Sequence, residues 1–404
     1  MSTRGEIDLG VTRIKQLLAL LGNPHQTASR RAKRVFHVTG TNGKGSVATA
    51  LAVKMSHVCK VGLFTSPAYL RVGDNICVYE GGHASRLELA SLQFRQLRKM
   101  VISLWLTRSL GALTEFEIET SIAFLMFDLW KCDSLVVEVG MGGLRDATNV
   151  FSIPTISVIT SISLDHQVFL GNSVEEISRE KCGIFKKGGF LFAPVWLPES
   201  VRSVIKSEAE SVGVEELIWV EPGNSFSGDC WEGTYQESNL AIANRILNYF
   251  EIPVDNSLGP VRPGRMQRLV INGRATLLDG AHNEEGLIAL TECLHGIFLN
   301  QRPRIIWLVA FSNGKQNLVE HLPISENDKI ICTEFSAVEL MPWVVHTKLE
   351  DLILSFEKKF PGFDTTGAVS LQEAISLTEN SACSDALLVV CGSLYLIREF
   401  LNTL

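Results

Sequence analysis

The chain has 404 residues, of which 46% are hydrophobic and 20% are charged, and its formal net charge is −7. A chain of this length predicts two or three domains with sizeable cores, because one domain usually holds about 100–200 residues. The apolar fraction excludes an intrinsically disordered protein, and the negative net charge excludes nucleic-acid binding through a broad basic surface.

The cysteines and the N-terminal segment indicate a cellular location. The nine cysteines are odd in number, scattered and never spaced as C-x-x-C, which disfavours a disulfide framework and a structural zinc site and is typical of the reducing cytosol. The segment MSTRGEIDLG has no apolar core of the kind that a signal peptide needs. The longest apolar stretches fall short of the roughly 20 residues that span a bilayer. We therefore expect a cytoplasmic protein that binds no membrane.

Short apolar runs rich in β-branched residues alternate with longer helical patterns. The expected strands are Arg34–Thr39, Ser134–Val139, Thr155–Ile162, Phe190–Ala193, Ala275–Leu278, Arg304–Val309, Lys329–Thr333 and Ala386–Cys391. Strands that are buried on both faces have such continuous apolar runs, and helical patterns between them predict parallel sheets. The fold class is therefore α/β, with doubly wound sheets.

The first strand, Arg34–Thr39, leads into the glycine-rich loop TGTNGKGS, and a helical pattern follows over Val47–Met55. Such a loop points free backbone N–H groups and the positive end of the helix dipole at an anion, and Lys44 adds a full charge. The spacing departs from the G-x-x-x-x-G-K-[ST] motif, because only two residues separate Gly40 from Gly43. An ordinary tight turn is the alternative. The three glycines with a lysine and a serine favour a triphosphate-binding loop.

The strand Ser134–Val139 carries Glu138 near its C-terminal end and runs into a second glycine-rich loop. A structural role at that position would normally call for valine or isoleucine. A carboxylate at the carboxyl edge of a parallel sheet lies where ligands bind, and it suits Mg²⁺. A salt-bridged strand terminus is the alternative, and position alone does not decide between the two.

Polar residues also follow the strand Thr155–Ile162, among them His166. A lone histidine is more often a hydrogen-bonded core or surface residue than a ligand, but its place after a strand, like that of Glu138, favours contact with a metal. A capping box beginning at Ser173 starts a helix that carries Lys181. Because most lysines near helix ends are exposed to solvent, Lys181 is expected to be a solvated lysine.

Prolines and glycines cluster between Ile252 and Gly264, which predicts a domain boundary. We place one domain at residues 1–255, a linker at 256–264 and a smaller domain at 265–404. The smaller domain has at least four strand patterns of its own.

Past this linker, the segment Leu277–Asn283 (LLDGAHN) is another step from a strand into a loop, and Arg265 precedes it. Asp279 is able to accept hydrogen bonds from ribose hydroxyls, and Arg265 is able to stabilise charge on a transferring phosphoryl group. Each segment alone predicts only a turn, whereas together they indicate part of a nucleotide site.

Eight segments in chain order resemble the successive motifs of the folylpolyglutamate synthase family. They are HVTGTNGKGS, TSP, TEFEIET, EVGMGGLRDATN, SLDHQVFLG, REKCGI, PGRMQ and LDGAHN. That family belongs, with the Mur enzymes of cell-wall synthesis, to the ATP-dependent amide ligases. The resemblance spans essentially the whole chain, since Cys391–Tyr395 (CGSLY) also fits. It implies a P-loop-type doubly wound domain and a smaller, Rossmann-like α/β domain.

The resemblance also implies an ATP site and a metal site. The residues implied to bind ATP are Asn42, Gly43, Lys44, Gly45, Ser46, Asn239, Arg265, Asp279 and His282. Ser66, Glu138 and His166 are implied to bind Mg²⁺. Lys181 matches a lysine that the family carbamylates, and a carbamate is an anion that helps to hold a second metal ion. Lys44, His166 and Lys181 are the residues implied to act in catalysis.

Bacterial members that also make dihydrofolate bind dihydropteroate through residues that match three segments here. The matching residues are Asp8, Leu9, Gly10, Thr114, Glu115, Phe116, Glu117, Arg145, Asp146 and Ala147. Their presence favours the bifunctional enzyme. Three departures lie near these segments: TSPHL is replaced by TSPAYL, the segment Gly73–Ile76 replaces an arginine-bearing one, and the Arg-Leu order before Asp146 is swapped.

The reaction implied by the resemblance is ATP-dependent joining of an acid to an amino acid. The γ-phosphoryl group of MgATP is passed to a substrate carboxylate, and the amine of L-glutamate attacks the resulting acyl phosphate. The acid is dihydropteroate, which becomes dihydrofolate, or the glutamyl chain of a reduced folate. We expect a monomer that binds ATP, Mg²⁺, L-glutamate and these acids and binds no nucleic acid.

Three alternatives stay open. The first is a folylpolyglutamate synthase without dihydrofolate synthase activity, and the second is a Mur-like ligase for other substrates. The third is a P-loop ATPase that needs no glutamate, but such an enzyme would not need the cluster around Arg265 and Asp279. A non-catalytic nucleotide-binding protein would be expected to have lost Glu138, His166 or Lys181.

Overall fold

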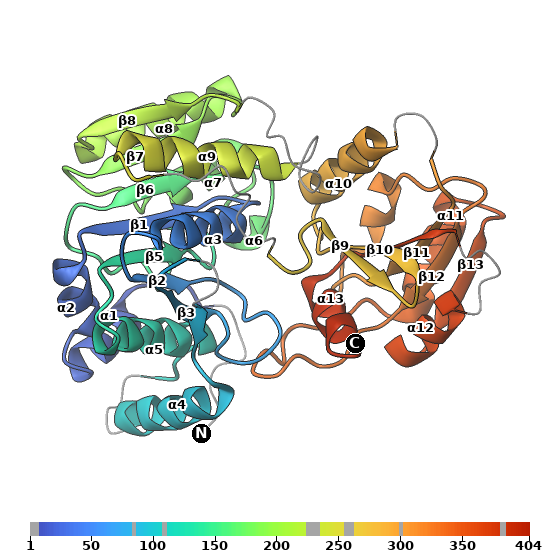
Figure 1. The fold of residues 1–404 in the computed structure, drawn as a ribbon, viewed down its shortest axis with the longest axis horizontal. Coiled ribbons are helices and arrows are strands. Elements are labelled where there is room, and N and C mark those ends of the chain that lie inside the picture. The colour runs from blue at the N-terminus through green and yellow to red at the C-terminus, as the bar shows by residue number, and fades with distance from the viewer. Residues whose placement is uncertain are drawn as a thin grey trace. The chain divides into compact units, whose positions relative to one another are not determined.

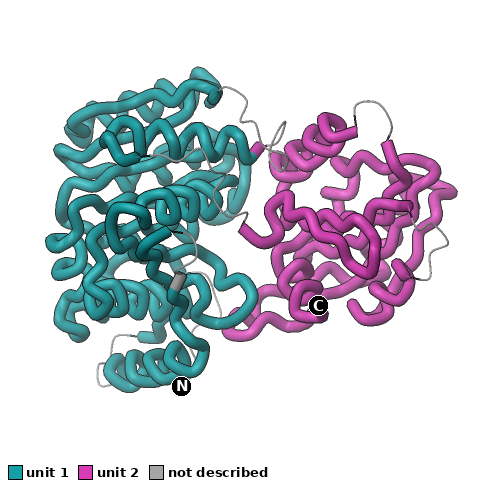
Figure 2. Tube along the Cα trace, in the orientation of Figure 1, with its two compact units in different colours: residues 1–226, 236–260 teal, residues 227–235, 261–404 magenta. Residues whose placement is uncertain are grey.

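The computed structural model describes residues 8–82, 86–106, 111–223, 235–253, 262–298, 302–379 and 385–404. The chain divides into two compact units, residues 1–226 with 236–260 and residues 227–235 with 261–404 (Figure 2). Tyr235 is the first residue of helix α9 (Tyr235–Tyr249) and is grouped with the second unit. Residues 256–261 of the expected linker lie outside the described residues.

The first unit is built on a sheet that has eight strands in the described part of the chain, in the order β4-β3-β2-β5-β1-β6-β7-β8 (Figure 1). The strands are β1 (Arg34–Thr39), β2 (Val61–Phe64), β3 (Ile76–Tyr79), β4 (Arg86–Glu88), β5 (Ser134–Glu138), β6 (Ile156–Ile159), β7 (Phe190–Pro194) and β8 (Glu216–Val220). The neighbouring strands in the part β2-β5-β1-β6-β7-β8 of this order all pair parallel, which confirms the α/β class. The antiparallel pairing of β3 with β2 and β4 was not expected.

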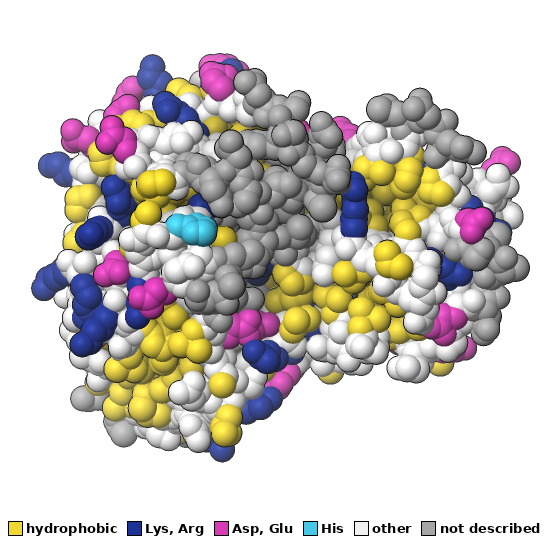
Figure 3. All heavy atoms as spheres, viewed as in Figure 1, with side chains coloured by type: hydrophobic (Ala, Val, Ile, Leu, Met, Phe, Trp, Pro, Cys, Tyr) yellow, Lys and Arg dark blue, Asp and Glu magenta, His cyan; other side chains and the backbone are white. Residues whose placement is uncertain are grey.

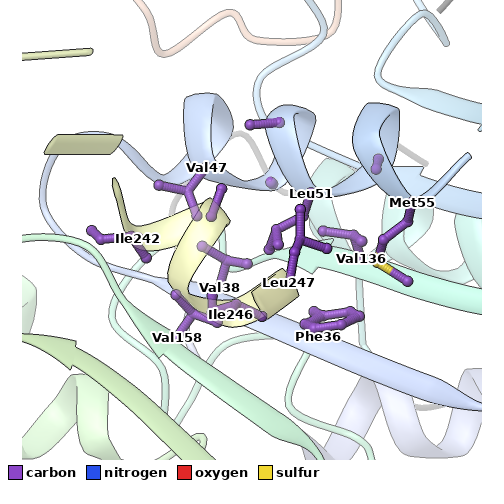
Figure 4. Packing of buried hydrophobic residues seen from close by; sticks show 14 of the residues in the cluster. Phe36, Val38, Val47, Leu51, Met55, Val136, Val158, Ile242, Ile246 and Leu247 are labelled. Atoms are coloured by element: carbon purple, nitrogen blue, oxygen red, sulfur yellow. The ribbon is translucent and has the colours of Figure 1, made fainter. Parts of the chain in front are cut away.

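Helices cover both faces of this sheet. Besides α9 they are α1 (Thr12–Leu20), α2 (Pro24–Arg31), α3 (Lys44–Met55), α4 (Ser91–Leu106), α5 (Glu115–Leu129), α6 (Gln167–Leu170), α7 (Val174–Cys182) and α8 (Glu199–Val212). Figure 4 shows the core under α3 and α9, where Phe36 and Val38 of β1 pack with Leu51 of α3 and Ile246 of α9. Alternate residues of a strand point to opposite faces, so His37 faces away from this cluster.

A second apolar cluster lies on the other face, under α7 and α8. Leu191 and Ala193 of β7 pack there with Ile177 of α7 and Ile205 of α8. Phe192, between them in the sequence, belongs to the cluster under α3 and α9. Because both faces of the central strands are buried, these strands are apolar throughout rather than alternating.

The second unit contains a sheet that has six strands among the described residues, in the order β13-β12-β11-β14-β10-β9. Its strands are β9 (Gln267–Ile271), β10 (Arg274–Asp279), β11 (Ile305–Val309), β12 (Lys329–Thr333), β13 (Asp364–Ala368) and β14 (Leu387–Cys391). Its helices are α10 (Glu284–Ile297), α11 (Leu349–Lys359), α12 (Leu371–Glu379), α13 (Leu394–Leu401) and the 3₁₀ helix η2 (Gln316–His321). Trp307 of β11 and Phe356 of α11 are fully buried in its core.

The edge strand β9 is an exception to the expected parallel pairing. It pairs antiparallel with β10, and the two are joined through Asn272 and Gly273. Both residues have positive φ angles, 50° and 80°, as a two-residue hairpin turn requires. The doubly wound sheets are thus parallel in their centres, as predicted, and each has antiparallel strands at one edge.

The surface carries mixed charge on the side that Figure 3 shows. Lys and Arg side chains lie among Asp and Glu side chains over the first unit. Among the described residues, no helix combines the length and the apolar character that crossing a membrane requires.

Candidate active site

The carboxyl ends of four adjacent parallel strands, β2, β5, β1 and β6, meet at one edge of the first sheet. Ser66 follows β2, Glu138 is the last residue of β5, and Thr160 follows β6. The register places Val38 of β1 beside Glu138, so the loop after β1 starts level with this carboxylate. Ligands of doubly wound folds bind at this edge.

Two glycines allow the phosphate loop, residues 40–43, to bend closely over the sheet. Gly40 has a φ of +154°, and a Cβ atom there would lie 1.9 Å from Oγ1 of Thr160. Gly43 has a φ of +84°, and a Cβ atom there would lie 2.3 Å from Oδ1 of Asn239. No side chain fits at either position without displacing a neighbour. Asn239 of α9, a predicted ATP-binding residue, therefore lies against the loop.

Hydrogen bonds to the segment after β6 brace the loop. The backbone N–H of Thr41 donates to the carbonyl of Ser161 at 2.9 Å, and that of Asn42 donates to Oγ of Ser161 at 2.9 Å. The hydroxyl of Thr160 donates to the carbonyl of Asn42 at 2.6 Å. The loop therefore has a defined shape that is held by its own protein contacts.

Lys44, Gly45 and Ser46 form the first turn of α3, directly after the loop. The first N–H groups of a helix have no acceptor within it, and the helix dipole adds partial positive charge at that end. The predicted order of strand, glycine loop and helix N-terminus is therefore confirmed, and anion binding at this turn stays a prediction.

Two lysines converge on one backbone carbonyl of the loop. Nζ of Lys44 donates to the carbonyl of Gly40 at 3.1 Å, and Nζ of Lys181 donates to the same oxygen at 2.8 Å. Lys181 is only 3% exposed, so the expectation of a solvated lysine was wrong. Burial, with the charge of Lys44 nearby, lowers the pKa of Lys181 to about 7. Much of this amine is therefore uncharged near neutral pH.

The predicted metal ligands are brought together only in part. The backbone N–H of Ser66 donates to Oε2 of Glu138 at 3.0 Å, and the Glu138 side chain is buried. His166 lies at the N-terminus of α6 with a half-exposed ring, and its Nε2 is 3.9 Å from Oδ2 of Asp165. Over the described residues, no three His, Cys, Asp or Glu side chains are grouped to hold a metal ion.

The three segments predicted to bind dihydropteroate lie side by side. They are Asp8–Gly10, Thr114–Glu117 and Arg145–Ala147. Arg13 of α1 joins the first two, because its guanidinium donates to Oδ2 of Asp8 at 2.9 Å and to Oε1 of Glu117 at 3.0 Å. The backbone N–H of Gly10 donates to the carbonyl of Arg145 at 2.8 Å, which joins the first segment to the third.

The second segment begins α5, and most of its side chains are held by protein contacts. Thr114 and Glu117 form a capping box, in which each side chain bonds the backbone N–H of the other residue. The carboxylate of Glu115 is buried and accepts two hydrogen bonds from Arg98, at 2.7 and 2.8 Å. Phe116 lies against the backbone of the second glycine-rich loop.

The third segment is part of that second loop, which folds around a buried carboxylate. Oδ2 of Asp146 accepts the backbone N–H of Met141 at 2.9 Å, and Oδ1 accepts that of Thr148 at 2.9 Å. Ala147 is buried beside it. The guanidinium of Arg145 pairs with a glutamate of α7 at 3.2 Å. The side chain of Asp146 therefore shapes this loop from the inside.

A third loop, between β2 and β3, contains the segment that departs from the family pattern. The carboxylate of Asp74 accepts the backbone N–H groups of Tyr69 and Leu70 at 2.7 and 2.6 Å. Asn75 donates to the buried carboxyl group of Glu119 at 3.3 Å. Burial raises the pKa of Glu119 to about 8, so this group is largely uncharged at neutral pH. The replaced residues thus hold the loop in place by hydrogen bonds of their own.

Asp279 ends strand β10 in the second unit and is fully engaged by protein donors. Its Oδ2 accepts the hydroxyl of Tyr235 at 2.6 Å and the backbone N–H of Met266 at 2.8 Å. Its Oδ1 accepts the backbone N–H of Ala281 at 2.9 Å. The positive charge of Arg265 also acts on this buried carboxylate. Arg265 and Asp279 are thus close together, as predicted.

Close to Asp279, His282 is fixed by two contacts. Its Nδ1 lies 2.9 Å from the carbonyl of Gly280, and its own carbonyl accepts a hydrogen bond from Nζ of Lys315 at 2.9 Å. Lys315 belongs to the loop between β11 and η2, which carries none of the predicted site residues.

Arg13, Tyr235 and Lys315 contact predicted site residues but were not themselves predicted. Arg13 and Glu117 are 104 residues apart, and Tyr235 and Asp279 are 44 residues apart. Each residue type is common on protein surfaces, and no local spacing links it to its partner. Only the tertiary structure identifies these contacts.

Comparison with known families places this fold and its strand-end loop among the ATP-dependent ligases of the Mur type. Residues 38–214 match the family described as Mur ligase middle domain, and residues 265–403 match the family described as dihydrofolate synthetase, C-terminal domain. The chain belongs to the dihydrofolate synthase/folylpolyglutamate synthase family. This confirms the family that the motifs predicted.

Relatives match over nearly the whole chain. The probable dihydrofolate synthetase of Schizosaccharomyces pombe is 32% identical, covering 97% of this chain and 97% of its own length. The dihydrofolate synthetase of Saccharomyces cerevisiae is 33% identical, covering 98% of each. The dihydrofolate synthase/folylpolyglutamate synthase of Bacillus subtilis is 32% identical, covering 96% of this chain and 94% of its own.

Solved structures share the fold. The folylpolyglutamate synthase of Mycobacterium tuberculosis complexed with ADP and AMPPCP has a TM-score of 0.81 at 23% identity, covering 98% of this chain and 95% of its own. FolC of Escherichia coli in complex with ADP has a TM-score of 0.79 at 25% identity, covering 98% and 94%. These likenesses confirm the predicted α/β architecture with N-terminal and C-terminal domains.

Proposed function

We propose that this chain is an ATP-dependent ligase that adds L-glutamate to dihydropteroate, making dihydrofolate, and to the glutamyl chains of reduced folates. The observation that carries this proposal is the match, over nearly the whole chain, to two relatives named dihydrofolate synthetase and to one named for both activities. The phosphate loop, Lys181 and Glu138 at one sheet edge supply the groups that such a reaction needs.

The reaction we propose has two steps. A carboxylate oxygen of the acid attacks the γ-phosphorus of ATP, ADP leaves, and an acyl phosphate forms. The amine of L-glutamate then attacks the acyl carbon, a proton is lost from nitrogen, and the C–O bond to phosphate breaks. The backbone N–H groups in the first turn of α3 and the side chain of Lys44 hold the phosphates and offset the charge on the transferring group.

The residues at the sheet edge fit a magnesium ion. The carboxylate of Glu138 is buried, and it accepts the backbone N–H of Ser66, the second residue after β2. Mg²⁺ prefers oxygen ligands and is usually bound by one or two carboxylates together with substrate phosphates and water, so a cluster of three carboxylates is not required. Ser66, Glu138 and His166 would hold it. When bound, the ion neutralises phosphate charge.

Lys181 is proposed to carry a carbamate, formed when its neutral amine attacks CO₂ and releases one proton. A buried amine with a lowered pKa has the lone pair that this reaction needs. The carbamate would remove the repulsion between Lys181 and Lys44 and would add an anionic oxygen ligand near the transferred phosphate. This is the chemical reason for burying a lysine beside a phosphate loop.

The remaining site roles and the domain boundaries also stay proposals. The first domain would bind dihydropteroate through the three adjoining segments, with Arg13 holding two of them together. Residues 265–404 would supply Arg265, Asp279 and His282 to ATP. We also propose a cytoplasmic location, which the seven free cysteines among the described residues support.

A phosphate-release assay tests the proposed substrates. We expect release only when ATP, L-glutamate and an acid are all present, with both dihydropteroate and a reduced folate acting as the acid. Activity with the reduced folate alone would limit the enzyme to polyglutamylation. ATP hydrolysis that is unchanged without glutamate would contradict ligase function and support the ATPase alternative.

A further inference from the structure

His37 in strand β1 has no part in the proposed reaction, although it lies only three residues before Gly40, the first residue of the phosphate loop. Its side chain is completely buried and points to the face of the sheet opposite to Phe36 and Val38. On that face, Nε2 of His37 lies 2.8 Å from Oγ1 of Thr148. Thr148 belongs to the loop that follows β5, 111 residues away in the sequence.

The hydrogen bonds from this imidazole run in one direction. The hydroxyl of Thr148 donates its one proton to Oδ1 of Asp146, which leaves it able only to accept from Nε2 of His37. Burial lowers the pKa of His37 to about 3, so the ring is neutral and has a single N–H group. Nδ1 is buried without a hydrogen-bond partner in the described part of the chain, so the proton belongs on Nε2.

The ring of His37 contacts the same loop at a second point. The ring of Phe151 packs edge-on against the imidazole, with 5.5 Å between ring centroids and an angle of 81°. Phe151 follows Thr148 by three residues, so one histidine holds both a polar and an aromatic side chain of this loop. Asp146, whose carboxylate accepts the last hydrogen bond in this series, also accepts the backbone N–H of Met141.

We propose that His37 is a positioning residue for the pterin site, which it acts on through Thr148 by fixing Asp146 and the loop around it. This role rests on the proposed function, in which Arg145–Ala147 belong to the dihydropteroate site. The backbone contact from Gly10 to Arg145, at 2.8 Å, joins this loop to a second segment of the site. A shift of the loop would therefore displace both segments.

Steady-state kinetics of two variants at this position test the proposal. His37→Phe keeps a flat buried ring but removes the donor, whereas His37→Gln keeps an N–H group near the place of Nε2. We expect His37→Phe to raise the KM for dihydropteroate about tenfold, the effect of one lost hydrogen bond, with the KM for ATP nearly unchanged. We expect His37→Gln to stay close to the wild type.

His25→Phe is the matched control. His25 is also a buried neutral histidine, with a pKa lowered to about 4, but its ring packs against Phe124 of α5 and reaches Phe151 of the loop only through that ring. If His37→Phe changes no more than His25→Phe, or if it raises both KM values equally, the positioning role is overturned. If His37→Gln is as impaired as His37→Phe, the hydrogen bond is not the cause and the proposal also fails. A wild-type protein without acid-dependent phosphate release would instead overturn the proposed function itself.

Discussion

At the scale of single residues, the site combines charged groups whose burial is energetically unfavourable. Lys181 and Lys44 share the carbonyl of Gly40, and no carboxylate is hydrogen-bonded to Nζ of Lys181 among the contacts described above. Burying one ammonium group beside another is unfavourable unless one of them loses its charge. The lowered pKa of Lys181 relieves this repulsion in part, and the proposed carbamate would turn it into an attraction.

The carbamate predicts selective chemical rescue. Lys181→Ala removes the amine and should lower the ligation rate about a hundredfold or more, a typical loss for one group that stabilises the transition state. Acetate should restore part of this rate, because a small carboxylate replaces the missing anion in the space that the side chain left. The measurement is phosphate release with increasing acetate, in chloride-matched buffer.

Lys44→Ala is the control for this rescue. Lys44 is proposed to act as a cation, so acetate should not restore its loss. Equal rescue of both variants, or a fully active Lys181→Arg variant, would show that no carbamate is needed at this position.

Residues differ in how well the sequence predicts them. Gly40 and Gly43 were predicted because a strand, a glycine loop and a helix are adjacent in the chain, and local spacing is sufficient to identify them. Lys181 was assigned a role only through family resemblance, since a lysine at a helix end is usually solvated. Arg13 could not be predicted, because its partner Glu117 is brought to it only by the tertiary structure.

At the scale of elements, the helix α5 carries part of the proposed pterin site. Its N-terminus is fixed by the reciprocal bonds between Thr114 and Glu117, and Arg13 donates to the same carboxylate. The start of α5 is therefore tied to α1 as well as to its own first turn. The position of the segment Thr114–Glu117 depends on this cap.

Removing the cap should cost stability. Thr114→Ala leaves the N–H of Glu117 without its acceptor, and we expect the free energy of unfolding to fall by about 1 kcal/mol. Thr114→Ser keeps the hydroxyl and should lose much less. Urea denaturation followed by circular dichroism measures both. An alanine variant as stable as the serine variant would contradict the role of the hydroxyl.

Elements with strong apolar patterns were predicted well, and short edge elements were not. The predicted strand Arg34–Thr39 matches β1 at both ends, whereas β6 ends at Ile159, before the predicted Ile162. Thr160 and Ser161 turn instead to hold the phosphate loop, so tertiary contacts end the strand early. The strand β9 was missed because its residues are only partly buried and have no continuous apolar run.

At the scale of the whole molecule, the chain forms two α/β units that match family descriptions in the same order. The first unit contains the phosphate loop and the three adjoining segments of the proposed pterin site, and the second contains Arg265, Asp279 and His282, which are proposed to bind ATP. The net charge of −7 excluded a broad polyanion-binding surface, and it remains compatible with a nucleotide site that is built from a few local cations. The fold class and family followed from the sequence, whereas the contacts that orient the side chains did not.

The central claim is that ATP activates a carboxylate as an acyl phosphate. The most direct test uses dihydropteroate whose carboxylate oxygens carry a heavy isotope, with ATP and L-glutamate, and mass spectrometry of the phosphate released. Because the oxygen that attacks phosphorus leaves with it, we predict one labelled oxygen in each phosphate formed. Unlabelled phosphate, formed while labelled dihydropteroate is returned unchanged, would show hydrolysis by water and would contradict the proposed reaction.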